Sequence, residues 1–175
     1  YKRQRLDRPV SGLVLIARNK SAAAKYSTLM QKEGGFNKQY EALICGKLSE
    51  PKGTFVDYLK KDGRTNTSAI VPADAAANDK DAKLSKLEYE VISYDEVKDI
   101  THVRIHLITG RHHQIRVQFA SRRHPLVGDY KYATADCGMD NAVKAVALKR
   151  NQIALCAVSL TVDNKTYSVA PEFLL

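Results

Sequence analysis

An acidic residue between two basic ones, near the start of the chain, is the first candidate for chemistry. Asp7 stands between Arg5 and Arg8. An aspartate that serves as a nucleophile or a base must stay ionised, although burial raises its pKa and a nearby guanidinium lowers it again. Arg116 is a reasonable distant partner for Asp7. A structural Arg–Asp pair that only ties two segments together is an equally good interpretation of the same residues.

Tyr40 is the second candidate, in the stretch Asn37-Lys38-Gln39-Tyr40-Glu41. A tyrosine in a strand usually belongs to the core or to a half-buried face, and the residues alone favour that interpretation. The functional alternative is a ring that stacks on a nucleobase and a hydroxyl placed for proton transfer. Lys38, two residues away on the same face, could then contact a phosphate.

Two adjacent histidines, His112 and His113, form the third candidate. Neighbouring residues on a helix do not face the same way, and no acidic residue nearby completes a ligand set, so we expect no metal site. The histidines are expected to hydrogen-bond neighbouring loops or RNA instead.

A net charge of +9 predicts a polyanionic partner, nucleic acid first and an anionic membrane second. The basic residues that recur at both ends of the chain are Lys2, Arg3, Arg5, Arg8, Arg111, Arg116, Arg122, Arg123 and Lys131. Tyr130 and Tyr132 lie among them, a pattern typical of contact with RNA phosphates. Glycine-rich phosphate loops are absent from the sequence, so no nucleotide cofactor is expected.

Length and cysteine usage set further limits. The 175 residues suit one domain, and the three cysteines are too far apart for a zinc motif and fit a reducing compartment. No apolar run approaches the roughly 20 residues of a membrane span, and no signal peptide is apparent. We therefore expect a cytoplasmic protein, a monomer without a membrane partner. The start at Tyr1 rather than methionine predicts an N-terminally truncated fragment.

Apolar periodicity predicts an α+β fold with a largely antiparallel sheet. Strands are expected over residues 13–17, 38–45, 53–59, 87–91, 103–107, 153–162 and 166–169, and helices over 21–32, 111–120 and 142–149. The run 13–17 is predicted to be a central strand, buried on both faces, with Asp7 in a loop at its mouth. Asn19 or Ser21 is expected to cap the first helix. Residues 72–83 are predicted to form a mobile loop.

Taken together, three segments resemble the RluA-type pseudouridine synthases, which modify ribosomal and transfer RNA. Arg5-Leu6-Asp7 with Ser11-Gly12 is similar to the family's His-Arg-Leu-Asp…Ser-Gly loop, and Lys38-Gln39-Tyr40-Glu41-Ala42-Leu43 to its Lys-x-Tyr-x-Ala-Leu strand. Residues 109–117 and 124–129 resemble its Thr-Gly-Arg-x-His-Gln-Ile-Arg stretch and His-Pro-x-x-Gly-Asp loop. Gln4 and Cys156 stand where the family usually has histidines, which bears on the choice of RNA.

The resemblance implies a mixed, mainly antiparallel sheet with flanking helices and a central catalytic cleft, spanning residues 1–175 as one catalytic domain. It implies that Asp7 is the catalytic aspartate, that Arg116 is its salt-bridge partner and that Tyr40 stacks on the target base. Arg5 would help to hold the flipped-out nucleotide. Lys38, Arg111 and His113 are expected to contact RNA, and the reaction needs no cofactor.

Two other functions stay open from the sequence. A degenerate synthase could keep the basic cleft and only bind RNA, although simple binding does not require a buried carboxylate facing a polyanion. A metal-dependent nuclease could use His112, His113 and Asp129, and would then need a divalent cation.

Overall fold

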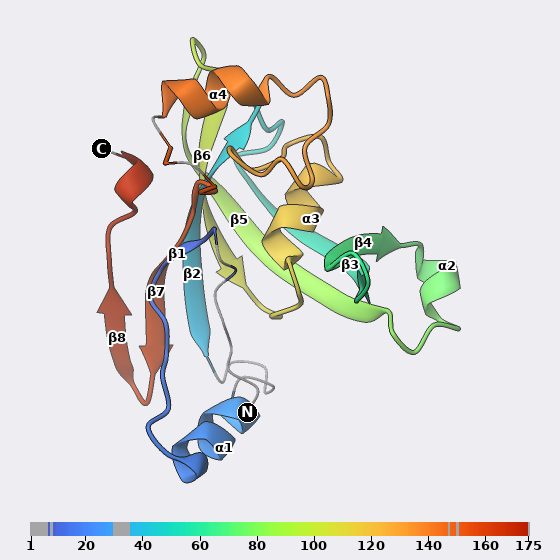
Figure 1. Ribbon diagram of the computed structural model, residues 1–175, viewed down its shortest axis with the longest axis vertical. Coiled ribbons are helices and arrows are strands. Elements are labelled where there is room, and N and C mark those ends of the chain that lie inside the picture. The colour runs from blue at the N-terminus through green and yellow to red at the C-terminus, as the bar shows by residue number, and fades with distance from the viewer. Residues whose placement is uncertain (1–6, 8, 30–35, 147, 150, 175) are drawn as a thin grey trace.

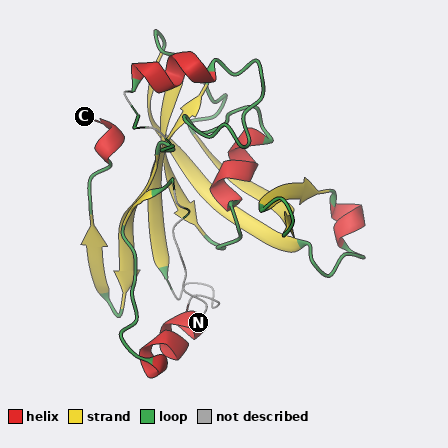
Figure 2. Ribbon diagram, viewed as in Figure 1, coloured by secondary structure: helices red, strands yellow, loops and turns green. Residues whose placement is uncertain are grey.

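The computed structural model describes residues 7, 9–29, 36–146, 148–149 and 151–174. Its strands are β1 (Ser11–Gly12), β2 (Asn37–Cys45), β3 (Lys52–Asp62), β4 (Thr67–Val71), β5 (Lys83–Asp95), β6 (Ile100–Leu107), β7 (Leu155–Val162) and β8 (Lys165–Ser168). The helices are α1 (Lys20–Leu29), α2 (Ala73–Ala76), α3 (Gln114–Ala120) and α4 (Met139–Ala145), with a short 3-10 helix η1 (Glu172–Leu174). The predicted α+β class is confirmed (Figure 2).

The strands form one sheet in the order β1-β7-β2-β6-β5-β3-β4, with β8 also pairing β7. Every pair is antiparallel except β1 with β7, which is parallel. The sheet is long and twisted, and α3 lies against it next to the β3–β4 hairpin (Figure 1). Among the helices that the structure describes, none combines the length and apolar character that a bilayer crossing requires.

Alternation along β2 places two apolar clusters on the two faces of the sheet. Ala42 and Ile44 belong to the cluster that includes Phe119 of α3, whereas Leu43 and Cys45 belong to the cluster of α4. Phe119 is fully buried and its ring meets two other aromatic rings with centroids 5.0 and 5.9 Å away. Such pairs each stabilise a core by about 1 kcal/mol beyond the burial of area. The first cluster therefore anchors α3 firmly on the sheet.

The prediction of a central strand over 13–17 is wrong. Strand pairing ends at β1, after which only the Leu13 N–H continues it, donating to the Ala157 carbonyl at 3.0 Å. Leu13 and Leu15 are partly buried, and the residues between and after them are exposed. Val14 and Ile16 are accordingly 49% and 78% exposed. An unbroken apolar run cannot distinguish burial on two faces from packing on one.

Several helix boundaries also differ from the predictions. Of the two predicted caps of α1, Asn19 is the one found, and its side chain accepts the Ala22 N–H at 2.8 Å. Residues 30–32 of the predicted helix lie outside the described residues. The helix expected from 111 starts at Gln114, because His113 takes a left-handed conformation with φ 53°. α4 begins at Met139, three residues before its predicted start. Residues 72–83 include the short helix α2, and β4 was not predicted at all.

Candidate active site

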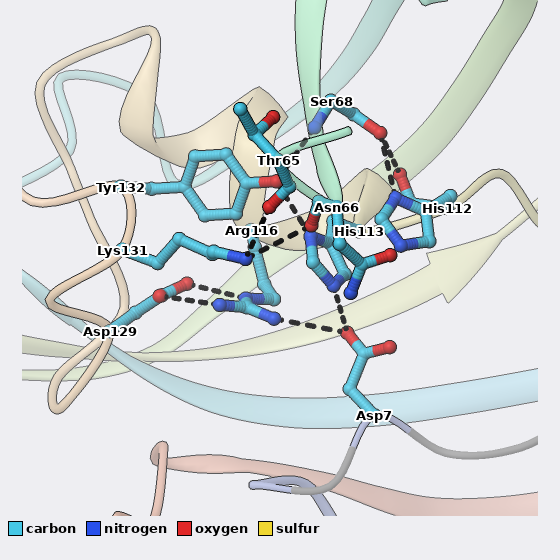
Figure 3. Close-up of polar contacts among 10 residues, drawn as sticks. All are labelled: Asp7, Thr65, Asn66, Ser68, His112, His113, Arg116, Asp129, Lys131 and Tyr132. Atoms are coloured by element: carbon cyan, nitrogen blue, oxygen red, sulfur yellow. Dashed lines mark hydrogen bonds and ion pairs between the residues drawn. The ribbon is translucent and has the colours of Figure 1, made fainter. Parts of the chain in front are cut away.

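Asp7 and Arg116 meet in the folded protein, although 109 residues separate them in sequence. Asp7 lies in the loop before β1 and Arg116 lies on α3, and Arg116 Nη1 donates to Asp7 Oδ2 at 3.2 Å (Figure 3). Both line a pocket with a cavity volume of about 240 Å³. The Asp7 side chain is 30% exposed and that of Arg116 only 6%. The carboxylate is therefore held from the protein side and open toward the pocket.

Arg116 is itself clamped by a second carboxylate, Asp129. Its Nε and Nη2 donate to the two Asp129 oxygens at 2.6 and 2.7 Å, and Asp129 is 1% exposed. Burial lowers the pKa of Arg116, but Asp129 and then Asp7 more than offset this, so the guanidinium stays charged. This bidentate geometry is the strong form of such an ion pair. Asp129 therefore aims the remaining Arg116 nitrogen at Asp7.

The loop that carries Asp129 is held tightly against the protein. Gly128 has φ 87°, and a Cβ at that position would lie 2.4 Å from the Gln152 carbonyl oxygen. Only glycine fits such a place without strain. The Asp129 N–H donates to the Leu126 carbonyl at 3.0 Å, which completes the turn. The sequence motif in 124–129 thus supplies the turn that delivers Asp129 to Arg116.

Tyr40 lines the pocket from β2 and also packs against the apolar cluster of α3. The pairing of β2 with β7 shifts by one residue between Gln39 and Tyr40. A bulge of this kind re-aims a side chain, and bulges are frequent beside functional sites. Burial, and then the negative charge of Asp7, raise the pKa of Tyr40 to about 12. Its hydroxyl is therefore neutral at neutral pH.

His113 completes the surroundings of Asp7. Its Nε2 lies 3.4 Å from Asp7 Oδ2, and its Nδ1 lies 2.6 Å from the Tyr132 hydroxyl oxygen (Figure 3). That oxygen accepts the backbone N–H of Ser68, on β4, at 2.9 Å. Burial and the charge of Arg116 lower the pKa of His113 to about 4. The imidazole is thus neutral at neutral pH, and the His113 side chain is only 5% exposed.

The two histidine rings stack on each other, contrary to the expectation that they face different ways. Their centroids are 3.7 Å apart and the planes differ by 26°. They precede α3 rather than lie on it, and the left-handed backbone of His113 brings the rings together. His112 Nδ1 lies 2.9 Å from Ser68 Oγ. Among the described residues, no three acidic, histidine or cysteine side chains are grouped as metal ligands would be.

The residues expected to contact RNA do not lie together in one place. Arg111 lines the pocket, and its Nε donates to the Leu84 carbonyl at 2.9 Å. Lys38 lies outside the pocket lining, with Nζ 5.5 Å from the centre of the Phe36 ring and a pKa lowered by burial to about 8. His113 is buried within the network described above. Arg5 lies outside the described residues.

Sequence reasoning missed three members of this site. Asp129 was named as a possible metal ligand and as the last residue of the 124–129 motif, but not as a partner of Arg116, and Ser68 was not named. Tyr132 was noted only as an aromatic residue among basic ones, and its hydroxyl connects Ser68 of β4 to His113. Lys131 adds to this joint, since its Nζ donates to the Thr65 and Asn66 carbonyls at 3.3 and 3.0 Å (Figure 3). The motif around Asp129 was the one signal available in the sequence. A backbone N–H such as that of Ser68 gives no signal, because every residue except proline has one.

Comparison with known proteins gives one family model and several similar sequences. Residues 3–121 match the family model described as RNA pseudouridylate synthase. The chain is 36% identical over 131 residues to ribosomal large subunit pseudouridine synthase D of Blochmanniella floridana, covering 74% of this chain and 37% of that protein. It is 30% identical over 172 residues to the protein of the same name from Vibrio vulnificus, covering 97% and 50%. The chain thus spans at most about half the length of these relatives.

A solved structure shares the fold. Human RNA Pseudouridylate Synthase Domain Containing 1 superposes with a TM-score of 0.73 at 24% identity, covering 98% of this chain and 68% of that one. At this identity the likeness concerns the fold alone. The mixed, mainly antiparallel sheet is therefore the architecture that this chain and the human protein have in common.

Proposed function

Because the chain belongs to the RNA pseudouridylate synthase family, we propose that it isomerises uridine in RNA to pseudouridine, with Asp7 as the catalytic carboxylate. One observation carries the assignment of the site. Asp7 and Arg116 meet at 3.2 Å in a pocket that Tyr40 also lines. A purely structural ion pair would not require the carboxylate to line a cavity. The proposed catalytic domain spans residues 1–175.

The reaction rearranges bonds without oxidation or hydrolysis. The bond between N1 of uracil and C1′ of ribose breaks, the base turns in the pocket, and a bond forms between C5 and C1′. The proton on C5 leaves and N1 becomes protonated, so the atoms of substrate and product balance. The chemistry thus requires no cofactor. Asp7 acts on the ribose either as a nucleophile at C1′ or as a base at C2′.

The neighbours of Asp7 have separate tasks in this proposal. Arg116, fixed by Asp129, keeps the carboxylate ionised and aimed at the sugar. Tyr40 stacks on the extruded base, a contact worth about 1 to 3 kcal/mol in other RNA-binding and DNA-binding proteins. Because its hydroxyl is neutral, Tyr40 can accept the C5 proton only while it releases its own. A water molecule is the other candidate base for this step.

The substrate must leave its stack before it can reach Asp7, which costs a few kcal/mol. Contacts to phosphates offset this cost, and the net charge of +9 supports them. Arg111 lines the pocket and is positioned to contact the nucleotide. We propose that Lys38 and Arg5 contact flanking phosphates. The substrate is ribosomal or transfer RNA in the cytoplasm, with ribosomal RNA favoured by the names of the relatives, and the enzyme acts as a monomer.

Mass-spectrometric mapping of pseudouridine tests this function directly. RNA from cells with and without the parent gene would be compared, and the purified chain would be added to RNA from the deficient cells. We expect at least one pseudouridine to disappear with the gene and to return on addition of the protein. A chain that binds this RNA but restores no pseudouridine would instead support the non-catalytic RNA-binding module.

A further inference from the structure

His113 has two ring nitrogens with different neighbours, and the surrounding hydrogen bonds determine which one carries the proton. The Tyr132 hydroxyl oxygen already accepts the Ser68 N–H at 2.9 Å. Its single proton needs an acceptor, and His113 Nδ1 lies 2.6 Å away. Tyr132 therefore donates to Nδ1, which leaves the imidazole proton on Nε2.

A proton on Nδ1 instead of Nε2 would be unfavourable at both ring nitrogens. With the proton on Nδ1, the Tyr132 oxygen would accept twice, and its own proton would have no acceptor among the contacts of the described residues. The lone pair of Nε2 would also face Asp7 Oδ2, 3.4 Å away. An acceptor facing a carboxylate at that distance is repelled, whereas an N–H is attracted.

We propose that Tyr132 is a positioning residue that holds His113 as the neutral tautomer protonated on Nε2, so that His113 presents a hydrogen-bond donor to Asp7. This inference deepens the proposed function and rests on it for its catalytic meaning. Asp7 then has two donors on one oxygen, the Arg116 guanidinium at 3.2 Å and the imidazole at 3.4 Å. The second distance is longer than a standard hydrogen bond, so the imidazole N–H acts on Asp7 mainly by electrostatic attraction.

Two features of the structure keep this arrangement in place. His112 stacks on His113 with a centroid separation of 3.7 Å, which prevents the ring from turning. Burial and the adjacent Arg116 disfavour the imidazolium and keep the pKa of His113 at about 4. The ring is therefore neutral throughout the neutral pH range, and Nδ1 remains an acceptor for Tyr132. The β4 strand thus reaches Asp7 through Ser68, Tyr132 and His113 in turn.

The tautomer can be measured without any assay of activity. The protein has five histidines, and nitrogen-15 labelling of histidine gives a long-range proton–nitrogen spectrum for each. The His113 signals are assigned from their loss in His113→Gln. We expect the neutral tautomer protonated on Nε2 from pH 6 to 8 in the unmodified chain. A proton on Nδ1, or an imidazolium at pH 7, would overturn the proposal.

Tyr132→Phe removes the donor and keeps the ring. We expect a mixture of the two neutral tautomers and a fall in kcat of about tenfold, with KM changed less than about twofold. Tyr94→Phe is the matched control, because the Tyr94 hydroxyl donates to the Asp99 carboxylate at 2.8 Å and neither residue lines the pocket. It should change neither the tautomer nor kcat. An unchanged kcat in Tyr132→Phe would also overturn the proposal.

A pair of substitutions at His113 covers the case in which Tyr132→Phe does not fold. Asn favours the left-handed backbone of this position but does not reach Asp7, whereas Gln places an amide N–H near the position of Nε2. We expect His113→Gln to keep several-fold more turnover than His113→Asn, and equal losses would contradict a donor role. If the unmodified chain makes no pseudouridine, the proposed function fails, while the tautomer measurement still decides this inference.

Discussion

Tyr40 and Glu41 are neighbours on β2, yet they lie on opposite faces of the sheet and in unlike surroundings. Tyr40 lines the pocket. Glu41 is 8% exposed and binds two side chains of β6, Arg104 and His102, at 3.0 and 3.1 Å. Each Glu41 oxygen therefore has a partner from the adjacent strand. The cluster ties β2 to β6 and has no oxygen left for another ligand.

Asp7 shows the contrasting arrangement. One of its oxygens, Oδ2, contacts both Arg116 and His113, and within the described part of the chain no donor reaches Oδ1. A carboxylate with both oxygens satisfied stabilises the fold, whereas one held by a single oxygen beside a cavity keeps capacity for a substrate. Burial of charge alone therefore does not mark a site. The number of unsatisfied acceptors next to a pocket is the better indicator.

Asp7→Asn should produce the largest effect, because it removes the reacting charge and little else. We expect pseudouridine formation to fall by about 10⁴-fold or more, measured as tritium release from RNA labelled at C5 of uridine. RNA affinity and the midpoint of urea unfolding should change little. Release at the rate of the unmodified chain would remove Asp7 from the mechanism and make it resemble Glu41.

Asp129→Ala should affect both activity and stability, since it leaves the buried Arg116 without its bidentate partner. Breaking a buried ion pair on one side costs about 3 to 5 kcal/mol in free energy of unfolding. Urea unfolding measures the loss. Asp140→Asn, on the exposed part of α4, serves as the control and should unfold as the unmodified chain does. Equal stability of both variants would mean that Asp129 does not hold Arg116.

Acidification should lower the free energy of unfolding through the protonation of His113. The unfolded chain protonates this residue below about pH 6.5, the folded protein only below about 4. Between these values the unfolded state binds more protons, so the free energy of unfolding falls as pH decreases, by about 3 kcal/mol in all. The charged or titratable groups that shift this pKa are Arg116, Asp7, His112 and Lys131.

Urea titrations at pH 4, 5, 6 and 7 would measure this acid dependence in the unmodified chain and in His113→Gln. The variant should lack most of the pH dependence that His113 contributes. The carboxylates and the other histidines should contribute equally to both proteins. Parallel curves for the two proteins would contradict a neutral His113 in the folded state.

Tyr40→Phe should separate chemistry from binding. The ring stays and can still stack, so RNA affinity should change less than about twofold, whereas kcat should fall by about 10- to 100-fold if the hydroxyl transfers a proton. Single-turnover measurements with saturating enzyme would give the two quantities separately. Equal losses in affinity and turnover would mean that the hydroxyl serves only the structure of the pocket.

Glu41→Gln, at the next residue, should have the smallest effect and the opposite distribution. An amide in this place leaves Arg104 and His102 poorly paired, which should cost about 1 to 2 kcal/mol of stability without affecting turnover. The test combines urea unfolding with the same single-turnover assay as Tyr40→Phe. A loss of turnover comparable to that of Tyr40→Phe would show that the two faces of β2 are not independent.

The sequence allowed several features to be predicted correctly, and each has a local cause. The α+β class followed from alternating apolar residues, and the Asn19 cap from the side-chain chemistry of that residue. The final hairpin was expected from strands at 153–162 and 166–169, and the two residues of its turn, Asp163 and Asn164, have positive φ angles. The pairing of Asp7 with Arg116 was expected, with a catalytic role and a purely structural role as the two alternatives. Its geometry is found as expected, and the catalytic role stays a prediction.

Other features depended on what each segment packs against. The apolar run after Gly12 carries the same pattern whether it pairs inside a sheet or not, and only the tertiary structure shows that pairing ends at β1. The stacking of His112 on His113 depends on one left-handed residue before α3, which residue type permits but does not require. These errors arise because periodicity records which residues are apolar, and does not record what covers them.

By itself the sequence determined the residue types available for chemistry: a carboxylate, an arginine on a short helix and a tyrosine on a strand. Tertiary structure decided how many partners each one has. Arg116 receives Asp129 on one side and Asp7 on the other only because a turn, a helix and an N-terminal loop converge. Hydrogen-bond satisfaction is a property of three-dimensional neighbours, so a linear pattern can nominate an acid but cannot show which of its oxygens remains available.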